Sequence, residues 1–203
     1  MNASSRTTRR IAVTGGPGSG KTTLVAALAA RGFRTVPEAA IEVIRELVAE
    51  HGNEGQREWR RKHGARFQAR ILARQTAAEE ALGAEAGPVF LDRGRHDGLA
   101  YCRYRKDVPP DELLPALEGW RYDAVFLLAT LTEFADRRAT GRTSTRADSI
   151  GLGGTLAAVY AEFGMRPFVV PEASVEERVA IVLARLEQLG WNAPPPLAGP
   201  RLS

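Results

Sequence analysis

The stretch "IAVTGGPGSGKTTLVAAL", residues 11–28, decides the fold of this 203-residue chain. An apolar run ends in a segment where glycine or proline fills five of six positions, 15–20, and a helical pattern follows. Residues 15–22 fit the pattern G-x-x-x-x-G-K-[ST]. That pattern between a strand and a helix predicts a phosphate-binding loop, or P-loop.

Each residue type in this loop has a physical purpose. Glycines let consecutive backbone N–H groups point at a phosphate chain, and the start of the following helix attracts the same anion. Lys21 would neutralise the outer phosphates, and Thr22 would coordinate Mg²⁺. A glycine-rich turn without function would need neither residue in that order. The cofactors expected are ATP, with GTP possible, and Mg²⁺. The residues assigned to the triphosphate are Gly15, Gly16, Pro17, Gly18, Ser19, Gly20, Lys21, Thr22 and Thr23.

Short apolar runs alternate with helical patterns along the chain. The runs that we interpret as strands are 9–15, 33–37, 87–92, 123–129 and 166–171. The helices expected are 21–32, 38–52, 55–86 and one that begins at Ser174, capped by Glu177. Strands separated by helices predict an α/β fold with a five-stranded parallel sheet covered on both faces. We expect one domain at 9–191, a disordered tail at 1–8 and a Pro-rich tail at 192–203.

Composition limits the partners. The net charge of +4 comes mostly from arginine, because there are only three lysines. This charge permits nucleic-acid binding, but no pattern of stacking aromatic residues supports it. No membrane partner is expected, because no apolar run approaches the length of about 18 residues that a membrane helix needs. The single cysteine, Cys102, excludes an internal disulfide and a cysteine-based zinc site, and favours a cytoplasmic location.

Carboxylates follow two of the predicted strands. Asp92 ends the strand 87–92, as a Walker B-type metal ligand does, although it could instead cap the next helix. Glu38 follows the strand 33–37 and could deprotonate an acceptor hydroxyl, or could simply interact with a helix dipole. Arg93 could contact a substrate or lie on the surface. Asp97 and Tyr101, one helical turn apart, could line an acceptor pocket or pack in the interior.

The segment 135–149, "ADRRATGRTSTRADS", is rich in arginine and poor in apolar residues. We expect a mobile, arginine-rich lid at about 131–150 that closes over the triphosphate and excludes water. Arg142 and Arg146 are the arginines chosen to neutralise charge during transfer. The alternative is a solvated basic loop.

Several motifs together resemble a known family: "TGGPGSGKTTL", "VPEAA", "FQARILARQ", "LDRGRHDGLAY" and "VPEASVEERV". They are similar to the AAA_28-type P-loop ATPase/kinase family, to nicotinamide riboside kinase domains of NadR-like proteins and, more distantly, to deoxynucleoside kinases. The resemblance implies a kinase-type P-loop fold, with the Asp92 strand beside the P-loop strand. It implies Glu38 as the general base, and Gln75 and Asp97 facing the acceptor. The sequence 142–144, Arg-Thr-Ser, departs from the family's Arg-Thr-Glu in the lid.

These observations predict a P-loop phosphotransferase that moves the ATP γ-phosphoryl group, with Mg²⁺, to a hydroxyl of a small molecule. The acceptor would be nucleoside-like, or another metabolite or natural product. The expected catalytic residues are Lys21, Glu38, Asp92, Arg142 and Arg146, and the expected acceptor contacts are Glu38, Gln75, Arg93, Asp97 and Tyr101. The alternative is a nucleotide-hydrolysing switch, an ATPase or GTPase acting through a protein partner. A GTPase would be expected to carry an Asn-Lys-x-Asp stretch where this chain has "LATLTEFADRR".

Overall fold

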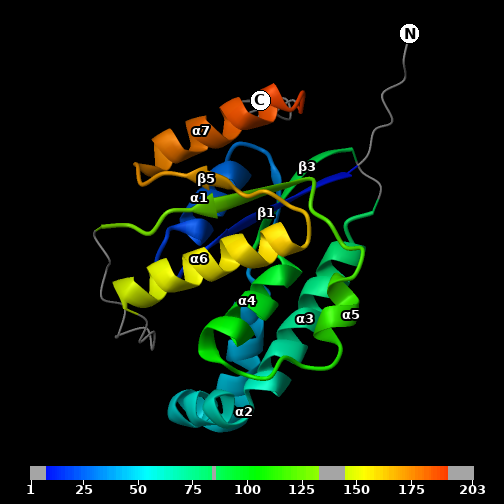
Figure 1. Cartoon of the computed structure of the whole chain (residues 1–203), viewed down its shortest axis with the longest axis vertical. Coiled ribbons are helices and arrows are strands. Elements are labelled where there is room, and N and C mark those ends of the chain that lie inside the picture. The colour runs from blue at the N-terminus through cyan, green and yellow to red at the C-terminus, as the bar shows by residue number, and fades with distance from the viewer. Residues whose placement is uncertain (1–7, 84–85, 133–144, 192–203) are drawn as a thin grey trace, which may run out of the picture.

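A parallel sheet of five strands forms the centre of the computed structural model, which describes residues 8–83, 86–132 and 145–191 (Figure 1). Its order is β2-β3-β1-β4-β5, so the strand before the P-loop lies between β3 and β4. The predicted α/β fold is confirmed, and so is the position of the Asp92 strand beside the P-loop strand. The strands are β1 (Thr8–Gly15), β2 (Arg34–Val36), β3 (Gly87–Asp92), β4 (Ala124–Leu128) and β5 (Phe168–Val170).

Helices cover both faces of the sheet (Figure 1). α1 and α7 lie on one face and α4 and α6 on the other, while α2, α3 and α5 extend below the sheet in this view. The helices are α1 (Lys21–Ala29), α2 (Ala39–Lys62), α3 (Gly64–Glu80), α4 (Arg95–Arg105), α5 (Leu113–Leu117), α6 (Arg146–Glu162) and α7 (Val175–Gln188). Among the described residues, none of them combines the length and the apolar character that a membrane crossing requires.

Alternation along β1 builds the two halves of the core, because successive side chains of a strand point to opposite faces. Ile11 and Val13 pack with Leu24 of α1 and Val182 of α7. Ala12, between them, faces the other cluster. β1 is therefore buried on both faces, which explains why it appears in the sequence as a continuous apolar run rather than as an alternating one.

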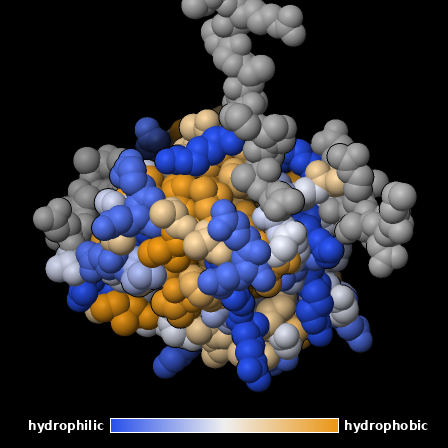
Figure 2. Space-filling view, turned by 90° about the horizontal axis from the view of Figure 1, so that it is seen from above, coloured by the Kyte–Doolittle hydropathy of each residue, from blue (hydrophilic) through white to orange (hydrophobic). Residues whose placement is uncertain are grey.

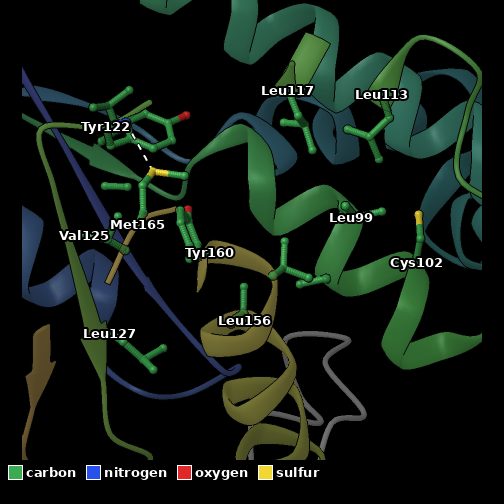
Figure 3. Packing of buried hydrophobic residues seen from close by; sticks show 14 of the residues in the cluster. Leu99, Cys102, Leu113, Leu117, Tyr122, Val125, Leu127, Leu156, Tyr160 and Met165 are labelled. Atoms are coloured by element: carbon green, nitrogen blue, oxygen red, sulfur yellow. Dashed lines mark hydrogen bonds between the residues drawn. The ribbon is translucent and has the colours of Figure 1, made fainter. Parts of the chain in front are cut away.

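The larger core cluster fills the space between the sheet, α4 and α6 (Figure 3). Leu156 and Tyr160 of α6 point into it, and Leu99 comes from α4. The backbone N–H of Tyr122 donates to Met165 Sδ at 3.3 Å, which ties the segment before β4 to the segment after α6. This packing fixes the start of α4 relative to the sheet, and that start carries several of the predicted site residues.

The long helix predicted for 55–86 is wrong, because two helices share this stretch. α2 kinks at Gly52, where φ is 72°, continues to Lys62, and is separated from α3 by His63, whose backbone is not helical. The reversal brings Phe67 back against Leu47 in a small apolar cluster of its own. Burial of this seam between α2 and α3 favours two packed helices over one extended helix.

Capping boxes start two of the helices. Ser174 and Glu177 cap α7 as predicted. Thr145 and Asp148 cap α6 in the same way, so Arg146 lies in the first turn of a regular helix. Residues 146–150, which the predicted lid at about 131–150 includes, are therefore part of α6. Arg142 and the rest of the predicted lid, residues 133–144, lie outside the described residues.

The edge strand β5 leaves two large apolar side chains exposed, Phe168 and Val169. Seen from above Figure 1, on the side where α7 lies, orange hydrophobic residues are interspersed with blue hydrophilic ones (Figure 2). Arg185 of α7 lies over the Phe168 ring, with its Cζ 5.4 Å from the ring centroid. This contact covers part of the edge with a charged side chain, a common protection against edge-to-edge pairing.

One core residue is unusual. His96 is 0% exposed and lies among the rings of Tyr122, Tyr160 and Phe163, at centroid distances of 5.8, 5.2 and 4.8 Å. Neither ring nitrogen has a hydrogen-bond partner among the described residues. Burial, together with the positive charges of Arg121 and Arg95, lowers the pKa of His96 to about 4.

We predict that His96 makes the fold sensitive to acid. The unfolded chain protonates this histidine near its ordinary pKa of about 6.5, whereas the folded state resists protonation down to about pH 4, so stability falls as the pH drops between these values. The free energy of unfolding is measured in urea at pH 7 and at pH 4.5. Between these two values it should decrease in His96→Phe by on the order of 2–3 kcal/mol less than it decreases in the parent protein. Carboxylate titrations occur in both proteins and cancel in the difference. Equal losses in both would contradict the prediction, and His51→Gln, in an exposed residue of α2, is the control.

Candidate active site

The P-loop connects β1 to α1 and requires glycine at several positions. Gly15, Gly18 and Gly20 have φ values of 147°, 74° and 87°, which side chains disfavour. A Cβ on Gly15 would lie 2.8 Å from the carbonyl oxygen of Leu128 in β4. The glycine pattern in the sequence therefore reflects both backbone conformation and close approach to the neighbouring strand.

Lys21 lies against its own loop. Its Nζ donates to the carbonyl oxygens of Gly15 and Gly16 at 3.0 and 2.8 Å, and the residue is only 5% exposed. Burial lowers the pKa of Lys21 to about 7, and repulsion from Arg93 adds to this effect. A phosphate group bound here would favour the protonated ammonium, because an adjacent anion stabilises the charged form.

A second cationic side chain, that of Arg178, also holds the P-loop. The sequence analysis did not identify this residue. Arg178 of α7 is 3% exposed and donates to the carbonyl oxygens of Ser19, Ala129 and Pro171, the last two at 3.1 and 3.0 Å. Its guanidinium joins the P-loop to the segments after β4 and β5. A Cβ on Gly20 would lie 3.2 Å from this guanidinium. Arg178 is therefore a positioning residue of the loop.

The first turn of α6 also packs against the loop. A Cβ on Gly16 would lie 2.2 Å from the carbonyl oxygen of Ser149, so only glycine fits there. The buried Ser149 hydroxyl pairs with that of Thr130 at 2.9 Å. The start of α6, where Arg146 is exposed, is thus anchored directly beside the P-loop.

Asp92 and Thr22 are in contact at the carboxyl end of β3. Thr22 Oγ1 donates to Asp92 Oδ2 at 2.8 Å, while Asp92 Oδ1 is buried and has no hydrogen-bond partner among the described residues. Burial and the nearby Glu38 carboxylate raise the pKa of Asp92. The alternative role of Asp92 as a helix cap is wrong, because Gly94 occupies the N-cap position of α4.

A bound cation would provide a partner for Asp92 Oδ1, the buried oxygen that has no hydrogen bond from a described residue. A hydroxyl and a carboxylate oxygen are the hard ligands that Mg²⁺ takes alongside phosphate oxygens and water. The described residues hold no cluster of three or more His, Cys, Asp or Glu side chains, so they do not suggest an all-protein cage for a metal. Thr22 and Asp92 therefore fit a magnesium that is shared with a bound triphosphate.

Glu38 and Arg93 form a buried ion pair beside Asp92. Arg93 Nε donates to Glu38 Oε1 at 2.8 Å, and Arg93 Nη1 donates to Asp97 Oδ2 at 3.1 Å. The surface position considered for Arg93 is therefore wrong. β2 is separated from the P-loop strand by β3, but the Arg93 side chain connects the ends of these strands. Both neighbouring carboxylates keep Arg93 protonated, and its pKa lies well above the usual value despite burial.

Asp97 occupies the centre of a buried network. It accepts from Thr14 Oγ1 and Tyr160 Oη, both at 2.8 Å, in addition to Arg93. These bonds explain its position through packing, whereas its predicted contact with an acceptor stays a prediction. Tyr101 lies farther along α4, and the Cζ of Arg93 lies 5.1 Å from the centre of its ring.

A cavity of about 100 Å³ opens beside these residues, between β2, β3, α2 and α3. Gln75, only 8% exposed, lines it together with Asp92 and Arg93. Apolar side chains, among them Val36 and Leu91, form other parts of its wall. The structure thus brings Gln75, Arg93 and Asp92 together around one small cavity, with Glu38 paired to Arg93. Tyr101 is not among the residues that line it.

Comparison with known proteins supports the assignment of a kinase-type P-loop fold to this chain. The sequence model of the AAA_28 family, described as an AAA domain, matches residues 10–178. No curated protein matches the chain. Among solved structures, NadR in complex with NAD and AMP-PNP aligns with a TM-score of 0.59 and 17% identity, over 93% of this chain and 51% of that chain. This chain therefore spans about half the length of NadR.

Two kinases align over nearly their whole length. Thymidylate kinase from Candida albicans has a TM-score of 0.59 and 12% identity, over 91% of this chain and 93% of that chain. Deoxyadenosine kinase from M. mycoides with bound dCTP has a TM-score of 0.61 and 16% identity, over 88% of this chain and 99% of that chain. Similarity at this level of identity shows a shared kinase-type P-loop fold.

We predict that Arg178 is needed to hold the P-loop in its nucleotide-binding shape. Arg178→Met removes the donors to three carbonyl groups, and net losses of about 1 kcal/mol per hydrogen bond predict a destabilisation of roughly 2–4 kcal/mol. The affinity for Mg·AMP-PNP should fall about tenfold or more, as measured by calorimetry below the unfolding temperature. Arg178→Lys should be intermediate, because an ammonium cannot reproduce the planar fork.

Arg185→Met, on the same helix, is the matched control, since among the described residues Arg185 bonds to the nearby Gln188 and contacts Phe168, and neither belongs to the P-loop. Unchanged nucleotide affinity in Arg178→Met would show that the loop holds its shape without this contact.

Proposed function

Since the chain belongs to the AAA_28 family of AAA domains, and since its site combines a P-loop with paired acidic and basic groups, we propose that it is a small-molecule kinase. It transfers the γ-phosphoryl group of ATP, together with Mg²⁺, to a hydroxyl of a small acceptor. The acceptor is nucleoside-like or a metabolite of similar size. The kinase-type fold, shared with nucleoside and nucleotide kinases, supports this proposal.

One observation carries the proposal. Glu38, Asp92, Arg93 and Lys21 are all buried and lie close enough that each of the other three affects the pKa of Lys21. They come from three segments, namely the start of α1, the end of β2 and the end of β3. These segments meet where parallel strands end, and ligands of such sheets bind at that end. An NTP-binding module without an acceptor would need Lys21, Thr22 and Asp92, but it gives no reason for a buried carboxylate and arginine beyond them.

The roles follow from position. Lys21 and the loop amides would bind the β- and γ-phosphates, and Thr22 and Asp92 would hold magnesium. The metal would supply charge neutralisation at the transferred group. Arg93 lies next to Asp92 and would neutralise charge on the transferred group from the acceptor side.

Glu38 is the proposed general base. Its carboxylate is oriented by the 2.8 Å bond from Arg93 Nε and lies one residue before α2. In the transfer, Glu38 accepts the proton of the acceptor hydroxyl, the acceptor oxygen forms a bond to the γ-phosphorus, and the bond to the β-phosphate oxygen breaks to release ADP. Asp92 is already bonded to Thr22, so the metal role suits it better than the base role.

Acceptor-dependent ADP production tests the proposal. The full chain with saturating MgATP is offered a panel of nucleosides, nucleotides, sugars and other hydroxyl compounds. The expected result is that at least one acceptor raises ADP release well above the basal rate and appears in a phosphorylated form by mass spectrometry. If a broad panel gives no stimulation, the kinase assignment fails and the nucleotide-dependent switch becomes the better interpretation.

Two substitutions distinguish the proposed role of Glu38 as general base from that of Asp92 as metal ligand. Glu38→Gln keeps a hydrogen-bond acceptor for Arg93 but cannot take a proton, so kcat should fall by about 10²–10⁴ with little change in Mg·AMP-PNP affinity. Asp92→Asn should instead raise the Mg²⁺ concentration needed for half-maximal nucleotide binding. A loss of metal-dependent binding in Glu38→Gln would exchange the two roles.

A further inference from the structure

The two faces of α3 differ in the size of their side chains. Its inner face is buried, and Phe67 and Ile71 on that face pack in the seam with α2. Its outer face carries a stripe of five residues with short side chains in the middle and a charge at each end. Ala69 is half-buried in this stripe and the other four residues are exposed. The members of this α3 stripe, which are spaced three or four positions apart, are Arg66, Ala69, Ala73, Ala77 and Glu80.

The α3 stripe borders a groove of about 470 Å³ between α3 and α5. The two helices lie side by side on the outside of the molecule (Figure 1). All of the stripe except Arg66 lines the groove, and α5 and the residue before it contribute Ala116 and Glu112. Because alanine side chains are short, another helix could pack here at the interaxial distance of about 8–10 Å that is typical of helix pairs.

The charges at the ends of the stripe are unpaired within the described part of the chain. Neither Arg66 nor Glu80 forms a hydrogen bond or an ion pair there with its side chain. The two arginines next to the stripe on the same helix behave differently, because Arg70 and Arg74 both pair with Glu46 of α2. α3 therefore uses two arginines to hold its neighbour and leaves one cation and one anion available at opposite ends of its exposed face.

Both of these charges are unfavourably placed with respect to their own helix. Arg66 lies in the first turn of α3 and Glu80 is its last residue, so a cation lies at the positive end of the helix dipole and an anion at the negative end. An antiparallel neighbour of the same sequence would reverse this relation. Its Arg66 would lie beside the C-terminal end of the first α3, and its Glu80 beside the N-terminal end.

The stripe is also complementary to itself in sequence. Arg66 and Glu80 each lie seven residues from Ala73, and Ala69 and Ala77 each lie four residues from it. A two-fold axis through a pair of antiparallel helices at Ala73 therefore places position 66 of one copy opposite position 80 of the other. Alanine faces alanine between the two charged contacts, which permits the close approach that the groove offers.

We propose that the α3 stripe binds a second copy of this chain through an antiparallel α3–α3 contact centred on Ala73. Arg66 of each copy pairs with Glu80 of the other. This inference goes beyond the proposed function and does not depend on it. Gln75, which lines the cavity beside Asp92, lies two positions from Ala73 and from Ala77, so it belongs to the opposite face of α3 and the contact leaves the cavity open.

Self-complementarity favours a second copy over a different protein. The acidic residues Glu80 and Glu112 line the groove, so a basic helix from another protein is the main competing occupant. Such a partner would leave Arg66 opposite a like charge, whereas a second copy supplies a carboxylate to it. Binding of a different protein to a chain that stays monomeric is therefore an outcome that contradicts the proposal.

Sedimentation of the purified full chain tests whether it self-associates. We expect a reversible equilibrium between monomer and dimer, with a dissociation constant that rises about threefold or more between low and high ionic strength, because exposed ion pairs are screened by salt. A monomer at every concentration up to about 0.5 mM, where a dimer of micromolar affinity would be saturated, would overturn the proposal.

Charge reversal tests the register of the two helices. Arg66→Glu and Glu80→Arg each place like charges opposite one another at both ends of the homodimer, so each should weaken self-association about tenfold or more. An equal mixture of the two variants should associate again. One variant then carries carboxylates at both positions and the other carries guanidinium groups, so both contacts of the mixed dimer are attractive. Undiminished self-association of either variant, or a mixture that stays monomeric, would contradict the antiparallel contact.

Two further variants control for unrelated effects. Ala73→Trp at the two-fold axis should block close approach and also give a monomer. Arg166→Glu, an exposed arginine in the segment before β5, should associate as the parent chain does. Cooperative thermal unfolding and retained binding of Mg·AMP-PNP show that each variant is folded. Because sedimentation requires no acceptor and no turnover, its outcome is independent of whether the kinase proposal holds.

Discussion

Burial of opposite charges at one edge of the sheet is the constraint on which the site depends. Lys21 and Arg93 face the three carboxylates of Glu38, Asp92 and Asp97, all of them buried. An isolated buried charge costs several kcal/mol, so each of these groups needs the others. Burial lowers the pKa of Lys21 and raises that of Asp92, and both shifts favour the neutral forms. A triphosphate and a divalent cation would reverse this tendency, because each supplies the counter-charge that one of the two groups lacks.

The same constraint explains why the phosphate-binding loop is held from several directions. Its carbonyl groups accept hydrogen bonds from Lys21 on one side and from Arg178 on the other. Gly16 is in contact with the first turn of α6, and Gly15 lies against β4. Within the loop, the Ser19 N–H donates to the Gly16 carbonyl oxygen at 3.3 Å, and the surrounding elements add to this by fixing the loop's shape through carbonyl groups and packing. Arg178 is effective in this role because one planar fork reaches three segments at once.

Local patterns in the sequence predicted the loop, the strand that ends in Asp92, the position of Glu38 and the cap of α7. These features depend on neighbouring residues and on helix or strand periodicity. The Asp97 network was beyond such reasoning, because Thr14 and Tyr160 lie 83 and 63 residues away from it. Arg178 left a detectable signal, since it occupies a core-facing position between Val175 and Val182 on an otherwise apolar stripe. The division between α2 and α3 left only a weak signal, Gly64 directly after His63, because residues 50–64 are mostly polar and the packing of Phe67 against Leu47 is a tertiary contact.

The two ends of the proposed site have different structural origins, and this difference bears on specificity. Groups near the P-loop are set by the ends of parallel strands, whose positions are fixed by backbone hydrogen bonds across the sheet. Gln75, which lines the cavity, instead depends on how α2 and α3 pack outside the sheet, where a kink at Gly52 and a break at His63 direct the chain. Changes in these helices would alter which molecule is held without disturbing the phosphate chemistry.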